Sequence, residues 1–233
     1  MNHFLASIIY NYVNFTFGIC TDHKNKDRIL LAINSIINLN IKNYEIIVIG
    51  GTESSYFNHP NVIFVNFDEN IKPIWITKKK NDIAKMAKYE NLCLMHDYFT
   101  FNSDWYEGYL KFDKEFGYWD VASNPQIMLD GRRHLLDWTG RDKNTGERFY
   151  PEYLDWSRIN EQYISGGFFL VKTQVILDNL LDENRGWDQD EDVEWSNRIK
   201  NKYVIRCNPY SSVRLTKESR SKNMINRYLE KLK

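Results

Sequence analysis

The sequence predicts an α/β protein with a mainly parallel central sheet flanked by helices. Two observations lead to this prediction. Between residues 14 and 96, apolar runs of strand length alternate with segments of helical period, in the order strand, helix, strand, strand, helix, strand. The run YEIIVIGG (44–51) is apolar and stops at two glycines, which is typical of a strand buried on both faces.

The other elements of this first part follow in order along the chain. NFTFGIC (14–20) is rich in β-branched and aromatic residues, which favours a strand. KDRILLAINSIINLN (26–40) places isoleucines at helical spacing, which predicts a helix. We also expect strands at 61–67 and 92–96 and a helix at 78–90.

The second half of the chain has a different character. We expect a helix at 104–116 and a strand at 118–124, followed by a polar segment, 125–160, with scattered Trp, Gly and Arg and no sustained period. A segment of that kind in a compact domain is a functional loop or contains short hairpins. The remaining expected elements are a strand and helix within 162–176, a helix at 190–202, a strand at 203–207 and a basic helical tail from Thr216.

Composition excludes several classes of partner. Lys+Arg and Asp+Glu both number 31, so no bulk charge attracts nucleic acid or a membrane surface. The three cysteines lack paired spacing, which indicates reduced thiols in a cytoplasmic compartment. The N-terminus lacks the features of a signal peptide, and the longest apolar segment is too short to span a bilayer. We therefore expect a cytoplasmic protein without an intrinsic membrane segment or a nucleic-acid partner.

The first candidate site is His96-Asp97, at the end of the apolar run LCLM. A carboxylate at a buried strand end suits Mg²⁺ or Mn²⁺, which prefer oxygen ligands. The alternative is an Asp that caps a turn, and by itself the pair favours that structural role.

The second candidate is the acidic block GWDQDEDVEWSNRI (186–199). Acids in a first helical turn are favoured by the helix dipole, but bunched acids raise one another's pKa and suit a general base. Glu191 and Asp192 point about 100° apart on a helix, so they cannot share one role. Trp187 suits either stacking on a sugar or the core, and Trp195 suits the core.

Two further stretches stand out. Gly166-Gly167 interrupts a strong strand pattern, which indicates a bulge or the close approach of a ligand. The lysines of WITKKKND (75–82) open a helix at the end where positive charge is disfavoured, unless an anion binds there or the run is simply solvated. No P-loop, GxGxxG, GxSxG or HExxH motif occurs.

Taken in order, FTFGICTD, YEIIVIGG, ITKKKN, LMHDYF, SGGFFLV and WDQDEDVEWSNR resemble the motifs of the GT-A fold, family-2-like nucleotide-sugar glycosyltransferases. The resemblance covers about Asn14 to Leu215. LMHDYF stands in the place of the DxD motif and WDQDEDVEWSNR in the place of the W-x-x-ED motif. The chain departs from the pattern in keeping one carboxylate in His-Asp-Tyr and in lacking a histidine after the last strand.

The resemblance implies a role for each residue singled out above. Asp192 is expected to be the general base, with Glu191 beside it. The metal ligand is expected to be Asp97, holding Mn²⁺ or Mg²⁺. Gly166, Gly167 and Trp187 are expected to border the sugar substrate. Thr21, Asp22, Lys79, Asn81, His96 and Asp97 are expected to lie near the nucleotide or its diphosphate.

The resemblance also implies the function and the organisation of the chain. The expected activity is transfer of a hexosyl group from a nucleotide-diphosphate sugar to a hydroxyl acceptor, with inversion. The alternative is a non-catalytic carbohydrate- or nucleotide-binding protein of the same fold. One domain is expected over 1–233, with a donor part at about 14–100, an acceptor-side and catalytic part at about 101–215 and a C-terminal helix at about 216–233.

We expect the polar segment 125–160 to form the acceptor face and to be mobile without ligand. Its Arg132, Arg133, Trp138 and Trp156 are the side chains expected to present that face.

Overall fold

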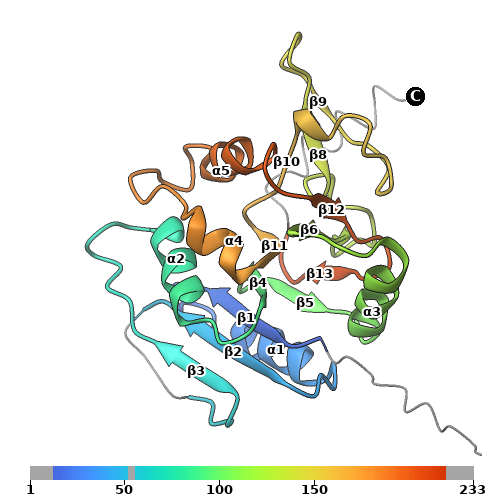
Figure 1. Cartoon of the computed structure of the whole chain (residues 1–233). Coiled ribbons are helices and arrows are strands. Elements are labelled where there is room, and N and C mark those ends of the chain that lie inside the picture. The colour runs from blue at the N-terminus through green and yellow to red at the C-terminus, as the bar shows by residue number, and fades with distance from the viewer. Residues whose placement is uncertain (1–12, 52–55, 219–233) are drawn as a thin grey trace, which may run out of the picture.

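The computed structural model describes residues 13–51 and 56–218, arranged around a seven-stranded sheet (Figure 1). Across the sheet the strands are β12 (Ile205–Cys207), β6 (Val121–Ser123), β11 (Phe168–Lys172), β4 (Asn91–His96), β1 (Phe15–Cys20), β2 (Tyr44–Ile49) and β3 (Val62–Val65).

The sheet is parallel except for one strand. β11 runs antiparallel to both of its neighbours, β4 and β6, and every other pairing is parallel. Every residue of β1 is buried, as expected of a strand with a neighbour on each side and helices on each face. These findings confirm the predicted α/β class and the mainly parallel sheet.

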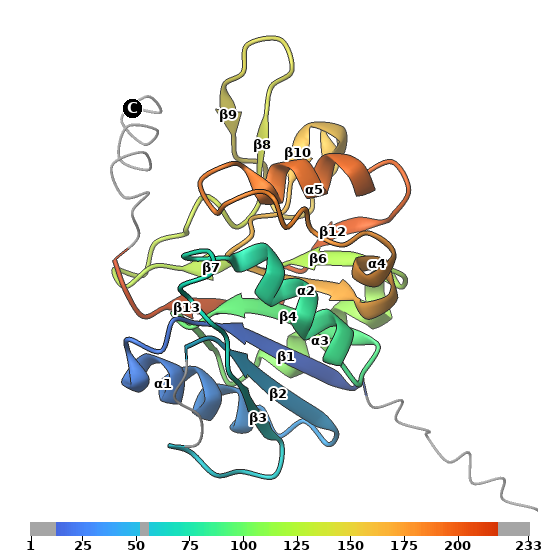
Figure 2. The same ribbon diagram turned by 90° about the vertical axis from the view of Figure 1, so that its left-hand side faces the viewer.

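Helices cover both faces of the sheet (Figures 1 and 2). α1 (Lys26–Ile37) and α3 (Trp105–Phe116) pack on the face that contains Phe15, Phe17 and Ile19. The opposite face contains Leu92 and Leu94 and is covered by α2 (Ile76–Met86), α4 (Thr173–Asp178) and α5 (Glu191–Ile199). Successive side chains of a strand point to opposite faces, so each apolar strand supplies both layers of the core.

Two smaller sheets complete the fold. One has the order β5 (Phe99–Phe101), β13 (Val213–Leu215), β7 (Gln126–Ile127). The other has the order β10 (Gln162–Tyr163), β8 (Thr139–Arg141), β9 (Arg148–Phe149), and a short 3₁₀ turn, η1 (Ile159–Glu161), precedes β10. The polar segment 125–160 therefore contains a short hairpin, one of the two alternatives that the sequence left open.

Several element boundaries differ from the prediction by a few residues, and two of the predicted elements differ further. The expected helix at 78–90 ends at Met86, because the amides of Lys88 and Tyr89 donate to the Glu45 and Thr16 side chains instead of to helical carbonyls. The strand expected around Gly166-Gly167 is two strands, β10 and β11, and the glycines form the turn between them.

The predicted C-terminal helix lies almost entirely outside the described residues, which end at residue 218. Within the described ranges, none of the helices has the length and apolar character needed to cross a membrane.

Gly18 allows α2 to pack directly on the backbone of β1. A Cβ atom at this position would lie 2.4 Å from Cγ2 of Ile83 on α2 and 3.0 Å from Cδ2 of Leu94. We therefore expect Gly18→Ala to lower the free energy of unfolding by about 1–3 kcal/mol, as overpacking does. Denaturant unfolding measures this change.

The partner variant Ile83→Ala removes the clashing methyl group. If α2 rests on Gly18, the double variant Gly18→Ala/Ile83→Ala loses clearly less stability than the sum of the two single variants. Additive losses would show that the two positions do not press on each other.

Candidate functional site

A cleft of about 610 Å³ opens at the carboxyl end of β4. Its walls come from the strand tip, the turn between β10 and β11, the loop before α5 and the first turn of α5. Six residues predicted from the sequence line it: His96, Gly166, Gly167, Trp187, Glu191 and Asp192.

Thr21 and Asp97 meet at this edge because β1 and β4 are paired in parallel and end together, with Cys20 opposite His96. The Thr21 hydroxyl donates to Oδ2 of Asp97 at 2.7 Å. Burial raises the pKa of Asp97, opposed by the Thr21 hydrogen bond and by Arg28. The sequence placed both residues at strand ends, and the structure brings them into contact.

Lys79 lies beside the same strand ends. The residue is 3% exposed, its Nζ donates to the Thr21 carbonyl at 2.7 Å, and it also pairs with Glu69. Asp22 is next to Thr21 in sequence but turns outward and pairs with Lys24 at 3.0 Å. Of these two residues predicted to contact the nucleotide, only Lys79 has a buried side chain directed at the strand ends.

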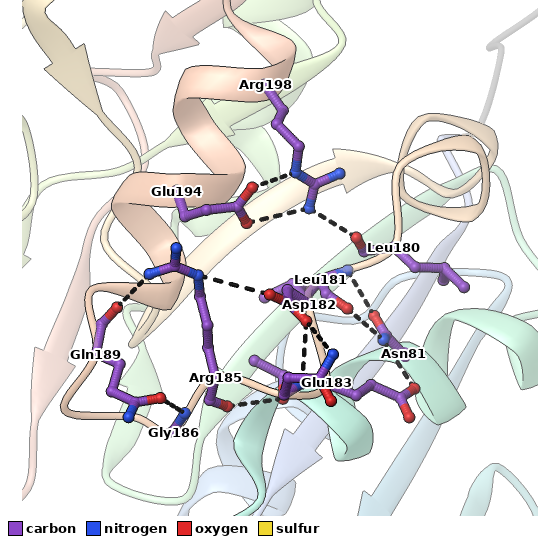
Figure 3. A network of polar contacts seen from close by, with 12 residues as sticks. Asn81, Leu180, Leu181, Asp182, Glu183, Arg185, Gly186, Gln189, Glu194 and Arg198 are labelled. Atoms are coloured by element: carbon purple, nitrogen blue, oxygen red, sulfur yellow. Dashed lines mark hydrogen bonds and ion pairs between the residues drawn. The ribbon is translucent and has the colours of Figure 1, made fainter.

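Asn81 does not line the cleft. Its fully buried amide donates to the Leu181 carbonyl at 2.9 Å and to Glu183 at 3.0 Å, and it accepts from the Leu181 amide at 2.9 Å (Figure 3). Both ends of the amide are thus occupied by the loop before α5. The structure gives Asn81 a role in holding this loop, and its expected position near the nucleotide stays a prediction.

Other side chains fasten the same loop to the turn before α2. Lys72 donates to the carbonyls of Glu183 and Asn184 at 2.7 and 3.0 Å. Trp75 Nε1 donates to the Glu183 carbonyl at 2.8 Å. The loop that carries Trp187 is therefore attached to the segment that leads into α2.

Asp192 faces the glycine turn. Its Oδ2 accepts from the Gly166 amide at 2.7 Å and its Oδ1 accepts from the Val193 amide at 2.8 Å. Glu191 points inward, is 6% exposed and lies 3.9 Å from Nζ of Lys80. Burial raises the pKa of Glu191 to about 7, with Lys80 opposing the shift and Asp192 adding to it. The two acids diverge as helix geometry predicts.

The glycine pair allows the turn to approach its neighbours closely. A Cβ at Gly166 would lie 3.0 Å from both Glu191 Oε1 and Lys80 Nζ, and one at Gly167 would lie 3.3 Å from the Tyr98 hydroxyl. The sequence indicated a close approach here. The groups that approach are side chains of the protein itself.

The two tryptophans of the acidic block separate. Trp187 is 46% exposed and lines the cleft, whereas Trp195 is 1% exposed and packs on Phe169 with ring centroids 5.3 Å apart. Trp195 is thus a core residue, as its helical position predicted.

The segment 125–160 is organised around Asp137, which is 1% exposed. Asp137 accepts from Arg133 at 3.0 Å and from the Tyr153 hydroxyl at 2.7 Å. Trp138 has no exposed surface, so it cannot present an acceptor face as we expected. The segment still contributes Gln126, His134, Leu136 and Arg148 to the cleft.

Three residues at or beside the cleft were not predicted from the sequence: Lys80, Tyr98 and Lys217. Tyr98 and Lys217 line the cleft, with the lysine Nζ 3.6 Å from the centre of the tyrosine ring. Lys80 had a detectable signal. Five of the buried residues of α2 recur at helical spacing and form a stripe that includes two lysines: Ile76, Lys79, Lys80, Ile83 and Ala84.

Comparison with known proteins addresses the fold. No protein-family model and no curated protein sequence matches the chain. Among solved structures, Staphylococcus aureus TarS residues 1–349 aligns with a TM-score of 0.62 and 15% identity over 86% of this chain and 60% of that one. The same TarS fragment in complex with UDP-GlcNAc aligns with a TM-score of 0.61 and 15% identity, over 89% of this chain and 60% of that one.

The chain has the GT-A glycosyltransferase fold. Full TarS aligns with a TM-score of 0.62 and 16% identity over 88% of this chain, but over only 37% of TarS. The chain therefore spans 60% of the length of the TarS fragment and 37% of the longer TarS structure, less than two thirds of either.

The strand tip of this GT-A fold offers few metal ligands. Within residues 13–51 and 56–218, no group of three or more His, Cys, Asp or Glu side chains comes together in a way that would hold a metal ion. Asp97 provides one carboxylate, and burial lowers the pKa of His96 well below its usual range, which leaves a neutral imidazole. Mg²⁺ often binds through one or two carboxylates plus substrate phosphates, so Asp97 fits a cation that a bound diphosphate helps to hold.

Asn81→Ala tests the structural role assigned to that residue. The variant removes three hydrogen bonds to the loop and leaves buried backbone groups unpaired, at a cost of about 1–3 kcal/mol for each such group. We expect faster hydrogen exchange at the Leu181 amide. Asn197→Ala, at an exposed position of α5, is the control. Unchanged exchange together with weaker nucleotide binding would instead support the role predicted from the sequence.

Proposed function

We propose that the protein is an inverting glycosyltransferase that moves a sugar from a nucleotide-diphosphate sugar to an acceptor hydroxyl. The observation that carries the proposal is the placement of Asp192, which lines the cleft and is held by the Gly166 amide. The fold supports the same activity, and TarS, which shares it, has been solved with UDP-GlcNAc and with UDP.

In the proposed reaction, Asp192 accepts the proton of the acceptor hydroxyl. The acceptor oxygen forms a bond to the anomeric carbon of the donor sugar. The bond from that carbon to the diphosphate oxygen breaks, and its electron pair leaves with the nucleoside diphosphate. Glu191 is less suited to be the base, because it is buried and faces Lys80 beneath the glycine turn.

The donor side of the proposal rests on the ends of β1 and β4. Thr21 and Asp97 are in contact there, and Lys79, which also pairs with Glu69, donates to the Thr21 carbonyl. A divalent cation held by Asp97 and the donor would neutralise charge on the departing diphosphate. Lys79 would add to that neutralisation.

A non-catalytic nucleotide- or carbohydrate-binding protein is the alternative. The observation in its favour is the single carboxylate at the strand tip, which already accepts the Thr21 hydroxyl. Release of nucleoside diphosphate from a panel of nucleotide sugars separates the two functions.

Asp192→Asn removes the proposed base and keeps the shape of the side chain. We expect turnover of the nucleotide sugar to fall by ~10²–10⁴-fold, the usual contribution of general-base catalysis, with donor affinity nearly unchanged. Glu194→Gln, also on α5 but outside the cleft lining, is the matched control. Normal turnover in Asp192→Asn together with its loss in Glu191→Gln would move the base by one residue.

Asp97→Asn tests the donor site. We expect Mn²⁺-dependent affinity for a nucleoside diphosphate to fall by about tenfold, which corresponds to ~1.4 kcal/mol. Titration calorimetry with UDP and GDP, with Mn²⁺ or with EDTA, measures it, and Asp104→Asn at the exposed start of α3 is the control. Equal affinity in the Asp97 variant and the native protein, in the presence of Mn²⁺, would refute this assignment.

A further inference from the structure

Lys80 is fully buried on the inner face of α2. Its Nζ makes no hydrogen bond to the described residues, whereas the neighbouring Lys79 donates to the Thr21 carbonyl. Burial of a cation is costly unless a counter-charge lies nearby. An apolar side chain at this position would avoid the free-energy cost of burying a charge, so the lysine requires an explanation.

The counter-charge is Glu191, whose Oε1 lies 3.9 Å from the lysine Nζ. The pair joins α2, on the donor side of the sheet, to α5, which carries the proposed base. The Phe169 ring closes it from below, with its centre 5.6 Å from Nζ. The charged groups that act on Glu191 are Lys80 from α2 and Asp190 and Asp192 from its own segment.

Gly166 lies directly over this ion pair. A Cβ there would meet both charged atoms at 3.0 Å and Cβ of Asp192 at 3.2 Å. The amide of the same glycine donates to the Asp192 carboxylate at 2.7 Å. The ion pair thus determines how closely the Gly166 turn approaches α2 and α5. The amide of that turn orients the Asp192 carboxylate.

We propose that Lys80 is a positioning residue, which holds the Glu191 carboxylate under the Gly166 turn and thereby keeps Asp192 aimed into the cleft. The inference rests on the proposed function for its kinetic consequence. The ion pair itself is independent of that function. Lys80 does not line the cleft and is not assigned a contact with substrate.

Protonation of Glu191 breaks this arrangement, because it removes the counter-charge of a buried cation. Burial raises the pKa of Glu191 to about 7 even with Lys80 opposing the shift, so loss of the lysine moves the pKa higher still. Turnover should therefore require pH values above that pKa, and the requirement should move upward without Lys80.

Three substitutions test this. Lys80→Met keeps the length of the side chain without its charge, Lys80→Arg keeps a charge, and Lys78→Met changes a partly exposed lysine of the same helix that pairs with Asp82. We expect the acidic limb of the kcat–pH profile to move up by at least about one unit in Lys80→Met, a tenfold loss of turnover on that limb. In Lys80→Arg the acidic limb should return to its position in the native protein, and in Lys78→Met it should stay at that position.

A measurement of stability keeps the inference separate from the proposed function. The pKa of Glu191 is raised from 4.5 to about 7 in the folded protein, so its contribution to stability is present below 4.5 and is lost as pH rises through 7. In Lys80→Met the pKa of Glu191 is higher, so the decrease in the free energy of unfolding with rising pH should continue to higher pH. The free energy of unfolding of this variant should therefore fall further below that of the native protein as pH increases, and Glu191→Gln should abolish the difference in slope.

The outcomes separate cleanly. The pH-dependent slope without turnover of any nucleotide sugar would support the ion pair and count against the proposed function. An unmoved acidic limb in a folded, active Lys80→Met variant would overturn the inference. Weaker binding of UDP or GDP by Lys80→Met, with the acidic limb unmoved, would also overturn the inference, since Lys80 would then act on the donor directly.

Discussion

The pairing of β4 with β1 on one side and β11 on the other brings the candidate residues at the strand ends to one edge of the sheet. β1 and β4 run in parallel and end together, with Cys20 opposite His96. β11 runs the other way, so its amino end lies at the same edge, with Phe168 opposite Met95. The Gly167 carbonyl accepts from the His96 amide at 3.0 Å, which ties the glycine turn to the strand tip. Thr21, Asp97 and Gly166 reach one edge of the sheet only because of this register.

Much of the fold could be predicted from the sequence because burial leaves a local pattern. The strands at 15–20 and 44–49 are apolar on both faces, and Trp195 follows the period of its helix. The positions of Asp97 and Asp192 at element ends were predictable for the same reason, since strand ends and helix starts are local features.

The parts that were missed depend on contacts between distant segments. Nothing near Asn81 in the sequence indicates that its amide would be taken up by Leu181, 100 positions away. The hairpin region is held by Asp137, whose partners include Tyr153. No local hydrophobic period in the sequence predicts that Asp137 is buried. Lys80 was missed for a different reason, because its local sequence suggests exposure. A run of three lysines suggests a solvated surface, and only the helical phase of the whole stripe places two of them inside.

The attachment of the loop before α5 has a consequence for how the cleft can change over evolution. Lys72 and Trp75 hold the loop through main-chain carbonyls, which every residue type supplies. The side chains at 183–185 and the cleft-facing Trp187 can therefore be exchanged while these particular bonds persist. Relatives with this attachment would be expected to diverge in the lining of the cleft sooner than in its shape.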